Sequence, residues 1–427
     1  MIRRHALRRL GAGLLSVPAL PVLGCATTAA ARPAWPPSVS EDDERFWAQV
    51  RANYPLTRDR VYFNTGGLGP APYPVLDAVQ ATVMELQRIS ETGHAKLEPA
   101  RMAVAAFIGC TPAELAFMRN ATEATSTIAS GLKSMQPGDE VIFESHAHPG
   151  GFIPWMSRAK QQGIVCKMFE PDPTSAAGNV ARIERLITPR TKVIQLSHVT
   201  APTGIRMPVE AIARLARQRG IWFHVDGAQS VGMFPVDVRA IGCDSFAASC
   251  HKWMNAPHGT GLLYIRADRF DEVMPTEVGA YSDAGVTLPD QLTYNPTAQR
   301  FEPGTRDVSS VVGVQAAVAF MNQIGMDWVA AHGQGLAQRA QAGLRAIPGI
   351  EVLTPSDPSL SGSITTFRSS TVPYDRMIAY LSSTHKLRTR TVAEVGINGI
   401  RVSTHVYNNA AEVDRLIEGV RQGQRDA

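Results

Sequence analysis

The segment Ser249-Cys-His-Lys252 places a lysine beside small polar groups, directly after the apolar run Phe246-Ala-Ala248. A lysine amine attacks carbonyl carbons once burial or a neighbouring cation lowers its pKa, and the product is a Schiff base. Most lysines are instead solvated surface residues, so a chemical role for Lys252 depends on what accompanies it.

Asp226 follows a second apolar run, Ile221–Val225, and Gln229 lies three residues further on. Pyridoxal 5′-phosphate (PLP) needs an acid opposite its pyridine nitrogen, because that ion pair keeps the ring protonated and able to take up electrons. We therefore predict that Asp226 binds the pyridine nitrogen and that Gln229 bonds the ring hydroxyl. The alternative for Asp226 is an N-cap of a following helix.

The segment Arg119–Thr125 has the composition of a turn that opens a helix. Backbone N–H groups of Ala121 and Glu123, with the Thr122 hydroxyl, would form a phosphate-binding cup there. Ordinary helix capping explains this segment nearly as well. Ser249 and His251 could add phosphate contacts beside Lys252.

The elements that must position these residues read as an α/β fold. Short β-branched or apolar runs predict strands at Glu140–Phe143, Lys192–Leu196, Ile221–Val225 and Gly261–Ile265, and helical spacing predicts a helix over 209–220. Strands and helices that alternate in this way favour a mostly parallel, doubly wound sheet, in which ligands gather at the carboxyl ends of the strands. We assign residues 46–307, including an N-terminal segment, to this large domain.

From Val308 the pattern changes, beginning with a long helical stretch near Ser309. Strands are then predicted at 349–353, 363–367 and 399–403, with a helix around Tyr374–Ser382 and a final amphipathic helix. Residues 308–427 are therefore predicted to form a connecting helix and a smaller α+β domain.

Residues 1–25 read as an export signal, because four arginines precede a short apolar run that is interrupted by glycine and proline. The paired arginines resemble a twin-arginine signal, and Val22-Leu-Gly-Cys25 resembles a lipobox with Cys25 as the lipidated residue. Three outcomes stay open: a periplasmic protein anchored to the membrane through Cys25, a soluble periplasmic protein cleaved after residues 29–31, and a cytoplasmic protein. Residues 26–45 are predicted to be a linker.

Charge and cysteine content exclude several classes. The net charge of +4 arises entirely from the four leader arginines, since the rest of the chain carries 38 basic and 38 acidic side chains. A neutral body argues against nucleic-acid binding. The five cysteines contain no CxxC pair, so we predict neither a metal site nor a disulfide framework.

Seven segments in order resemble the class V aminotransferase family of fold type I PLP enzymes, over about residues 60–420. Within that family they resemble the isopenicillin N epimerase-like branch. The segments are Tyr62–Pro70, Asn120–Glu123, His198–Gly204, Val225–Gln229, Ser249–Lys252, Arg300–Thr305 and Ile400–Ser403. The resemblance implies a large domain with a mostly parallel, seven-stranded-type sheet, a small C-terminal domain, PLP as cofactor and a homodimer with a shared active site.

The resemblance also implies a role for individual residues. Lys252 would form the internal aldimine, Asp226 would bind the pyridine nitrogen and His148, favoured over His146, would stack on the ring. Arg401 would grip the substrate carboxylate, a role that suits its planar fork. The remaining implied positions are Asn64 near the substrate, Ala121, Thr122, Glu123, Thr200, Gln229, Ser249 and His251 at the cofactor, and Thr305 at the partner subunit's phosphate.

These roles predict an exported PLP enzyme that acts at the α-carbon of an amino acid or peptide-like substrate, by transamination, epimerisation or lyase chemistry. The resemblance implies that a cysteine desulfurase carries a cysteine in its small domain, and no cysteine follows Cys250. Desulfurase activity is therefore expected to be absent. The alternatives are a periplasmic enzyme that tailors a secreted peptide such as a siderophore, and a non-catalytic binding protein on the same fold.

Overall fold

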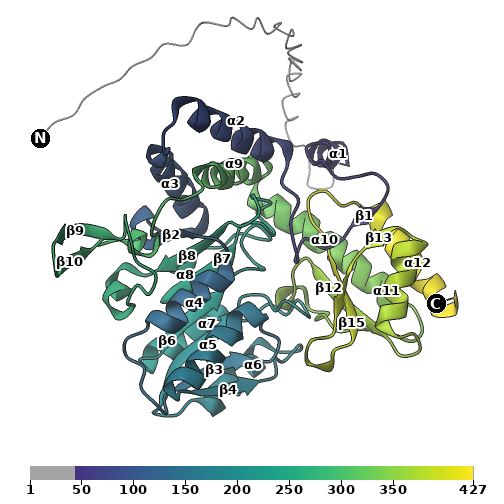
Figure 1. Cartoon of the computed structure of the whole chain (residues 1–427). Helices are drawn as coiled ribbons and strands as arrows, with labels where there is room; N and C mark the ends of the chain where they lie inside the picture. Colours follow the sequence, from purple (N-terminus) through teal and green to yellow (C-terminus); the bar gives the residue numbers. More distant parts are fainter. Residues whose placement is uncertain (1–43, 427) are drawn as a thin grey trace, which may run out of the picture. The chain divides into compact units, whose positions relative to one another are not determined.

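Seven strands form the central sheet of the computed structural model, which describes residues 44–426 (Figure 1). The predicted leader, Cys25 and all but the last two residues of the predicted linker lie outside the described residues. The strand order is β2-β8-β7-β6-β5-β3-β4. The bounds are β2 Leu115–Met118, β3 Glu140–Glu144, β4 Val165–Phe169, β5 Thr191–Ser197, β6 Trp222–Asp226, β7 Ser245–Ser249 and β8 Gly261–Ile265.

The sheet is mostly parallel, as predicted. Strands β3 to β7 run parallel to one another, whereas β8 pairs antiparallel with both β7 and β2. The predicted mostly parallel, seven-stranded sheet is thereby confirmed. The carboxyl ends of β6 and β7 lie side by side, which brings the residues after Asp226 and after Ser249 to one edge of the sheet.

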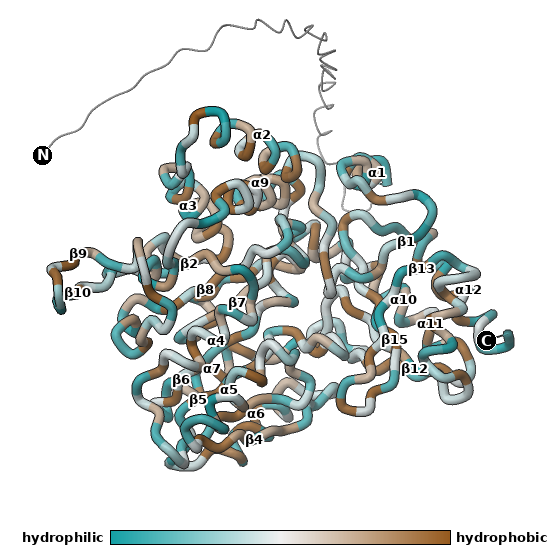
Figure 2. Tube along the Cα trace, viewed as in Figure 1, coloured by the Kyte–Doolittle hydropathy of each residue, from teal (hydrophilic) through white to brown (hydrophobic). Residues whose placement is uncertain are grey.

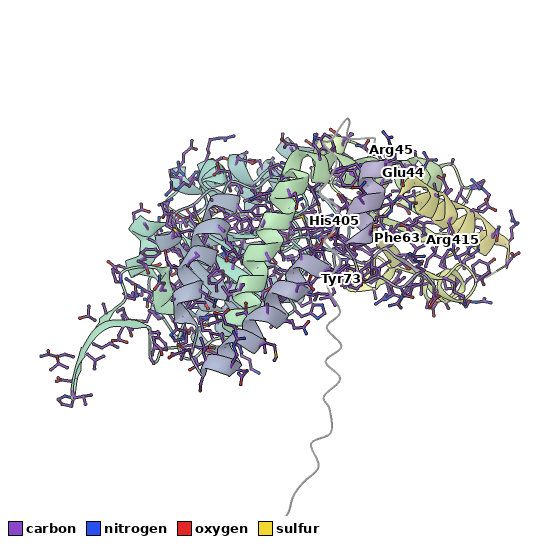
Figure 3. All side chains as sticks on the ribbon, turned by 90° about the horizontal axis from the view of Figure 1, so that it is seen from above. Glu44, Arg45, Phe63, Tyr73, His405 and Arg415 are labelled. Carbon is purple, nitrogen blue, oxygen red and sulfur yellow. The ribbon has the colours of Figure 1, made fainter. Side chains whose placement is uncertain are left out.

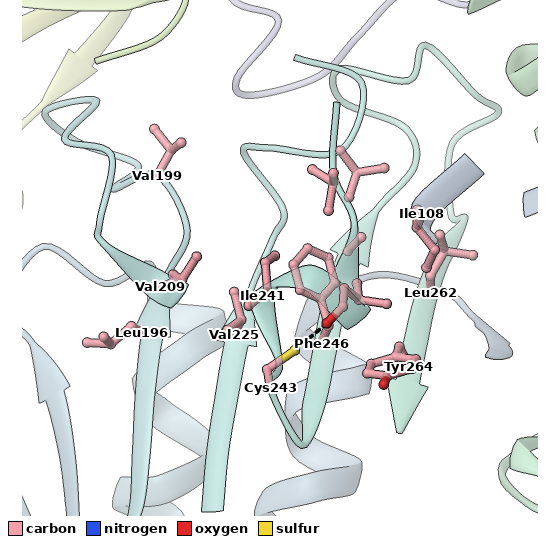
Figure 4. Close-up of a cluster of buried hydrophobic side chains, with 14 of the residues drawn as sticks. Ile108, Leu196, Val199, Val209, Val225, Ile241, Cys243, Phe246, Leu262 and Tyr264 are labelled. Carbon is pink, nitrogen blue, oxygen red and sulfur yellow. Dashed lines mark hydrogen bonds between the residues drawn. The ribbon is translucent and has the colours of Figure 1, made fainter. Parts of the chain in front are cut away.

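Both faces of the sheet are covered, and the strands are apolar on both sides for that reason. In β8, Leu262 and Tyr264 belong to one buried cluster, whereas Leu263 and Ile265 belong to another. This division follows from the two-residue period of a strand. Figure 4 shows part of the first cluster, where Phe246 of β7 lies among side chains from several strands and helices.

Helices occupy the segments between the strands. Helix α7 covers Val209–Gln218, close to the predicted range, and its buried residues Ile212, Leu215 and Ala216 occupy the predicted positions. The other helices of this part are α1 Glu44–Ala52, α2 Tyr73–Ile89, α3 Leu97–Ile108, α4 Ala121–Gly131, α5 Pro149–Gln162, α6 Ala176–Leu186 and α8 Val238–Ile241.

The C-terminal part contains a four-stranded sheet with the order β11-β12-β15-β14. The long helical stretch predicted near Ser309 is two helices that bend by 78° at Gly325, α9 Val308–Ile324 and α10 Met326–Arg345. The remaining elements are β11 Ile350–Val352, β12 Ile364–Ser369, α11 Tyr374–Ser383, β13 Leu387–Arg388, β14 Arg390–Val392, β15 Gly399–Ser403 and α12 Ala410–Asp426.

The start of the described chain reaches this C-terminal sheet region. Strand β1 (Val61–Tyr62) pairs in parallel with β13, and Phe63 is fully buried in the cluster formed by the C-terminal helices and strands. Helix α9, in turn, packs on α2 and α3. The predicted domain boundary between residues 307 and 308 coincides with the start of α9. That the chain divides into two domains at this point stays a prediction.

Two further features concern the surface. Strands β9 (Asp283–Thr287) and β10 (Gln291–Tyr294) form a separate antiparallel hairpin, whose apolar residues Val286, Leu288 and Leu292 are exposed. Figure 2 colours part of this hairpin as hydrophobic. Within residues 44–426, no single helix is long and apolar enough to cross a bilayer. Only α9 and α10 taken together, across their bend, combine the required length and apolarity.

Candidate active site

A cavity of about 290 Å³ lies where β6 and β7 end and α4 begins. It brings together nine of the residues predicted from the sequence: Ala121, Thr122, His148, Asp226, Gln229, Ser249, His251, Lys252 and Arg401. The same cavity is lined by residues that were not predicted, namely Gly66, Gly67, Asn120, Gly150, Ala228 and Arg390.

Lys252 follows β7 and is 9% exposed. Burial lowers the pKa of its amine to about 8, while Asp226 opposes this change and the guanidinium of Arg401 adds to it. The backbone around the lysine is held by the loop that begins at Asn64, since Gly69 donates its N–H to the carbonyl of His251 (2.8 Å). Any side chain at Gly69 would collide with the Lys252 carbonyl, because a Cβ there would lie 1.9 Å from its oxygen. The geometry therefore presents a buried amine that is readily deprotonated near neutral pH.

The segment after Lys252 is anchored from the C-terminal part of the chain. His405, labelled in Figure 3, is fully buried, and its Nε2 lies 2.7 Å from the carbonyl oxygen of Trp253. Trp253 Nε1 in turn donates to Oε1 of Gln229 (2.7 Å), and Gln229 Nε2 donates to the carbonyl of Gly66 (2.9 Å). The amide of Gln229 is thus held in one orientation, and Nε2 keeps one further hydrogen for a ligand.

Asp226 ends β6 with its carboxylate inside the cavity. Oδ1 accepts the N–H of Ala228 (3.0 Å). No helix starts there; Asp237 provides the N-cap of the next helix, α8, so the capping alternative for Asp226 does not hold. A Cβ added at Gly151 would lie 2.9 Å from Gln195 Nε2 and 3.4 Å from Asp226 Oδ2. Gln195 Nε2 is buried and has no partner.

These observations test whether the cavity fits PLP. A glycine leaves open the space in front of Asp226 Oδ2, and a buried amide nitrogen with no partner lies next to the same space. A carboxylate and a buried amine line one cavity, and an orphaned N–H donor lies beside the space next to that carboxylate. The carboxylate and the amine match the pyridine nitrogen and the aldehyde of PLP. The residues present therefore fit the cofactor.

The N-terminus of α4 supplies the phosphate end of the cavity. Asn120 caps the helix by accepting the N–H of Glu123 (2.9 Å), and Ser249 Oγ accepts the N–H of Ala121 (3.0 Å). His251 Nδ1 lies 3.0 Å from the carbonyl of Thr260, so Nδ1 carries the proton and Nε2 remains for a ligand. An anion at this helix end is favoured by the exposed N–H groups and by the helix dipole.

Arg401 lies on β15 and is 1% exposed. Nη1 donates to the carbonyl of Ala201 (2.8 Å), Nη2 donates to Asn64 Oδ1 (3.3 Å), and the buried Nε has no partner. Burial lowers the pKa of this guanidinium to about 9, with a smaller contribution from Arg390. A buried cation held only by neutral oxygens is costly until an anion binds it.

The two candidate histidines are separated by the structure. His148 lines the cavity and caps α5 by accepting the N–H of Gly150 at Nδ1 (3.0 Å), and burial lowers its pKa. His146 instead bonds Thr203 through Nδ1 (2.9 Å) and lines a different cavity. The placement favours His148 as the ring-stacking residue, and its role stays a proposal.

Four predicted residues do not line the cavity. Asn64 lies behind Arg401 and bonds it, whereas Thr200 is fully buried and accepts the N–H of Ile205 (2.9 Å). Glu123 binds Arg119, and Thr305 is exposed on the surface. The backbone N–H of Glu123 is bound by the capping Asn120. The roles of Glu123, Thr200 and Thr305 at the cofactor stay predictions.

Arg390 is the chief residue that the sequence did not reveal. It lies in a short strand of only three residues, and the motif with which the family resemblance ends begins ten residues later. No local pattern marks it, because its place in the cavity depends on how β14 pairs with β15.

Glu144 gives a prediction of pH dependence. Its carboxyl group ends β3, accepts the N–H of Ser197 (3.0 Å) and leaves Oε2 buried without a partner. Burial raises its pKa from 4.5 to about 7. The folded protein therefore holds this proton more tightly than the unfolded chain, so the contribution to stability is complete below pH 4.5 and is lost as the pH rises to 7.

We expect Glu144→Gln to remove this loss, which is on the order of 3 kcal/mol in the free energy of unfolding. Urea unfolding of both proteins at pH 5 and pH 8 measures it. The comparison is between the pH 5 to pH 8 differences of the two proteins, because other groups titrate equally in both. Equal differences would contradict the raised pKa.

The chain is similar in sequence to known proteins over most of its length. The model of the family described as aminotransferase class-V matches residues 63–416. A probable cysteine desulfurase of Methanothermobacter thermautotrophicus is 29% identical and covers 87% of this chain and 97% of its own length. Isopenicillin N epimerase of Amycolatopsis lactamdurans is 31% identical, with coverage of 88% and 98%.

Solved structures of PLP enzymes also resemble this chain over most of its length. The apo structure of a cysteine desulfurase from Thermococcus onnurineus matches with a TM-score of 0.80 at 26% identity, over 88% of this chain and 97% of that chain. A mutant of a protein named C-DES, with glycine covalently linked to its PLP cofactor, matches with a TM-score of 0.79 at 26% identity, over 87% and 98%.

These findings correct the predicted function. The exclusion of cysteine desulfurases was wrong, since proteins of that name are prominent among both the relatives and the solved structures. A cysteine missing from one position was too narrow a criterion, because the lysine, aspartate and arginine of the cavity are shared by several reactions. Export, the other part of that prediction, gains no support from the relatives.

Proposed function

Because this chain belongs to the aminotransferase class-V family, we propose that it removes sulfur from cysteine and passes the sulfur to a thiol acceptor. The observation that carries the proposal is the cavity that joins Lys252, Asp226 and Arg401, in a chain whose relatives include cysteine desulfurases over nearly their full length.

The family confirms that the chain is a PLP-dependent enzyme, that PLP is its cofactor and that the resemblance to the isopenicillin N epimerase-like branch was correct. Family members act on amino-acid substrates. In this chain Lys252 would hold PLP covalently, Asp226 would bind its pyridine nitrogen and the N-terminus of α4 would hold its phosphate. Bound PLP supplies an electron sink for bonds at the substrate α-carbon.

The protein's own groups then divide the work. Arg401 binds the α-carboxylate and thereby orients the substrate, because a guanidinium fork matches a carboxylate in two places. Lys252, whose pKa is lowered to about 8, can move a proton at Cα near neutral pH. Asp226 keeps a proton on the pyridine nitrogen, and His148 would cover one face of the ring.

The proposed reaction balances without a further oxidant or reductant. Cysteine and a thiol RSH give alanine and the persulfide RSSH, so the Cβ–S bond breaks, an S–S bond forms and a hydrogen is added to Cβ. None of the cysteines within residues 44–426 lines the cavity. Cys250, two residues from Lys252, is fully buried, and burial raises its pKa well above the ordinary range. The acceptor in the proposal is therefore a thiol that enters from solution.

The experiment measures alanine and sulfide released from L-cysteine by the PLP-loaded enzyme in the presence of dithiothreitol. We expect equal amounts of the two products. For Arg401→Lys, kcat/KM for cysteine should fall at least about tenfold, because a charge-assisted bond is worth about 1.5–3 kcal/mol.

Cysteamine, which lacks the carboxylate, is the matched control substrate and should be nearly insensitive to Arg401→Lys. Cysteine that is racemised but yields no sulfide would refute the proposed reaction and favour epimerase chemistry. An equal loss with cysteine and cysteamine would refute the role of Arg401.

We also propose a homodimer with a shared active site. The family resemblance places Thr305 at the phosphate of the partner subunit's cofactor. In this structure Thr305 is exposed and does not line the cavity of its own chain. The exposed apolar side chains of the β9–β10 hairpin support a protein contact on this part of the surface. A monomer mass in sedimentation equilibrium would contradict the dimer.

A further inference from the structure

Two arginines lie directly opposite each other on adjacent strands of the C-terminal sheet. Arg390 of β14 and Arg401 of β15 are partners in the antiparallel register, so their side chains leave the same face of the sheet. Both line the cavity that contains Lys252. Like charges at opposed positions destabilise a sheet, so folding alone gives no reason for this pair.

Each guanidinium also has a buried N–H group without a partner: Nε of Arg401 and Nη1 of Arg390. The other groups of Arg401 are bound by Ala201 and Asn64, and Nη2 of Arg390 forms an ion pair with Glu394. A buried donor that has lost its water without gaining a partner costs free energy. Two such donors at one cavity indicate an acceptor that the ligand supplies.

The charges suit one carboxylate and no more. Two guanidinium groups and the carboxylate of Glu394 leave a single positive charge on this side of the cavity. One carboxylate neutralises that charge and has two oxygens, one for each unpartnered donor. A second anion would have to displace Glu394 from Arg390.

We propose that Arg390 and Arg401 bind the same α-carboxylate of the substrate, and that Glu394 is a positioning residue that holds Arg390 in place for it. The inference rests on the proposed function, since it assigns a second arm to the same substrate site. The alternative is a site for two anions, in which Arg401 would bind the α-carboxylate and Arg390 would bind a separate acidic group of the substrate.

The test uses the PLP-loaded enzyme and two cysteine analogues that lack the amino group, so that binding is measured without turnover. 3-Mercaptopropionate has one carboxylate, and mercaptosuccinate has a second one. Their dissociation constants come from titrations followed by the absorbance of the cofactor and, independently, by the shift in melting temperature.

We expect Arg390→Gln to weaken both analogues by the same factor, of about tenfold or more. Arg390→Lys, which keeps the charge and loses the planar fork, should still weaken both. Arg388→Gln is the matched control, because Arg388 lies two residues away, outside the cavity, and bonds the carbonyl of Thr389; its dissociation constants should equal those of the unaltered enzyme.

Glu394→Gln tests the positioning role. It should raise KM for cysteine and leave kcat largely unchanged, whereas general structural damage would lower kcat as well. Unchanged binding of both analogues by Arg390→Gln would overturn the proposal. So would a loss confined to mercaptosuccinate, since that result identifies a separate subsite. The binding measurements with the two analogues do not depend on turnover, so a failure of the proposed reaction is recognised separately.

Discussion

In Lys252→Ala we expect no measurable sulfide release and no absorbance near about 420 nm from covalently held cofactor. The buried amine at the end of β7 is the group that would attach PLP and move the proton at Cα, and alanine offers neither function. PLP should still bind without a covalent bond, because the N-terminus of α4, Ser249 and His251 are unchanged. Absorption spectra and cofactor content of the purified variant measure both effects.

Borohydride reduction followed by mass spectrometry identifies the attachment site directly. The pyridoxyl label should appear on Lys252 in the unaltered enzyme and be absent from the variant. Lys160→Ala is a suitable control, because Lys160 is an exposed lysine of α5 outside the cavity. A label on any other lysine would refute the assignment.

Asp226→Asn should retain the cofactor and lose most of the activity. The amide is isosteric but neutral, so it does not hold a proton on the pyridine nitrogen and the ring becomes a poor electron sink. Loss of one preorganised electrostatic group costs several kcal/mol of the barrier, which corresponds to about 10²–10³ in kcat. Single-turnover rates with cysteine measure the change.

The control for this variant is Asp237→Asn. Asp237 is an exposed aspartate that caps α8 through the N–H groups of Arg239 and Ala240, so its replacement affects local stability and not turnover. Near-normal turnover by Asp226→Asn, with the cofactor bound, would contradict the pyridine-nitrogen role.

Prediction from the sequence was most accurate for elements whose bounds are set by the residues of a single segment. The bounds of β8 and β15 agree with the sequence, because β-branched and apolar residues bounded by glycine or polar residues mark a strand without reference to its neighbours. The antiparallel direction of β8 and the bend at Gly325 were not predicted. Strand direction depends on the partner strands, and helical spacing alone does not reveal a change of axis.

The sequence by itself determined the chemistry at the edge of the large sheet. Asp226 ends β6 and Lys252 follows β7, and since the carboxyl ends of parallel strands lie at one edge, their proximity followed from the pattern. The tertiary structure alone decided that His148 and not His146 lines the cavity, and that Arg390 enters it. These depend on which side chains from distant segments share one space, and for Arg390 on a strand register that shifts a side chain to the other face if it slips by one residue.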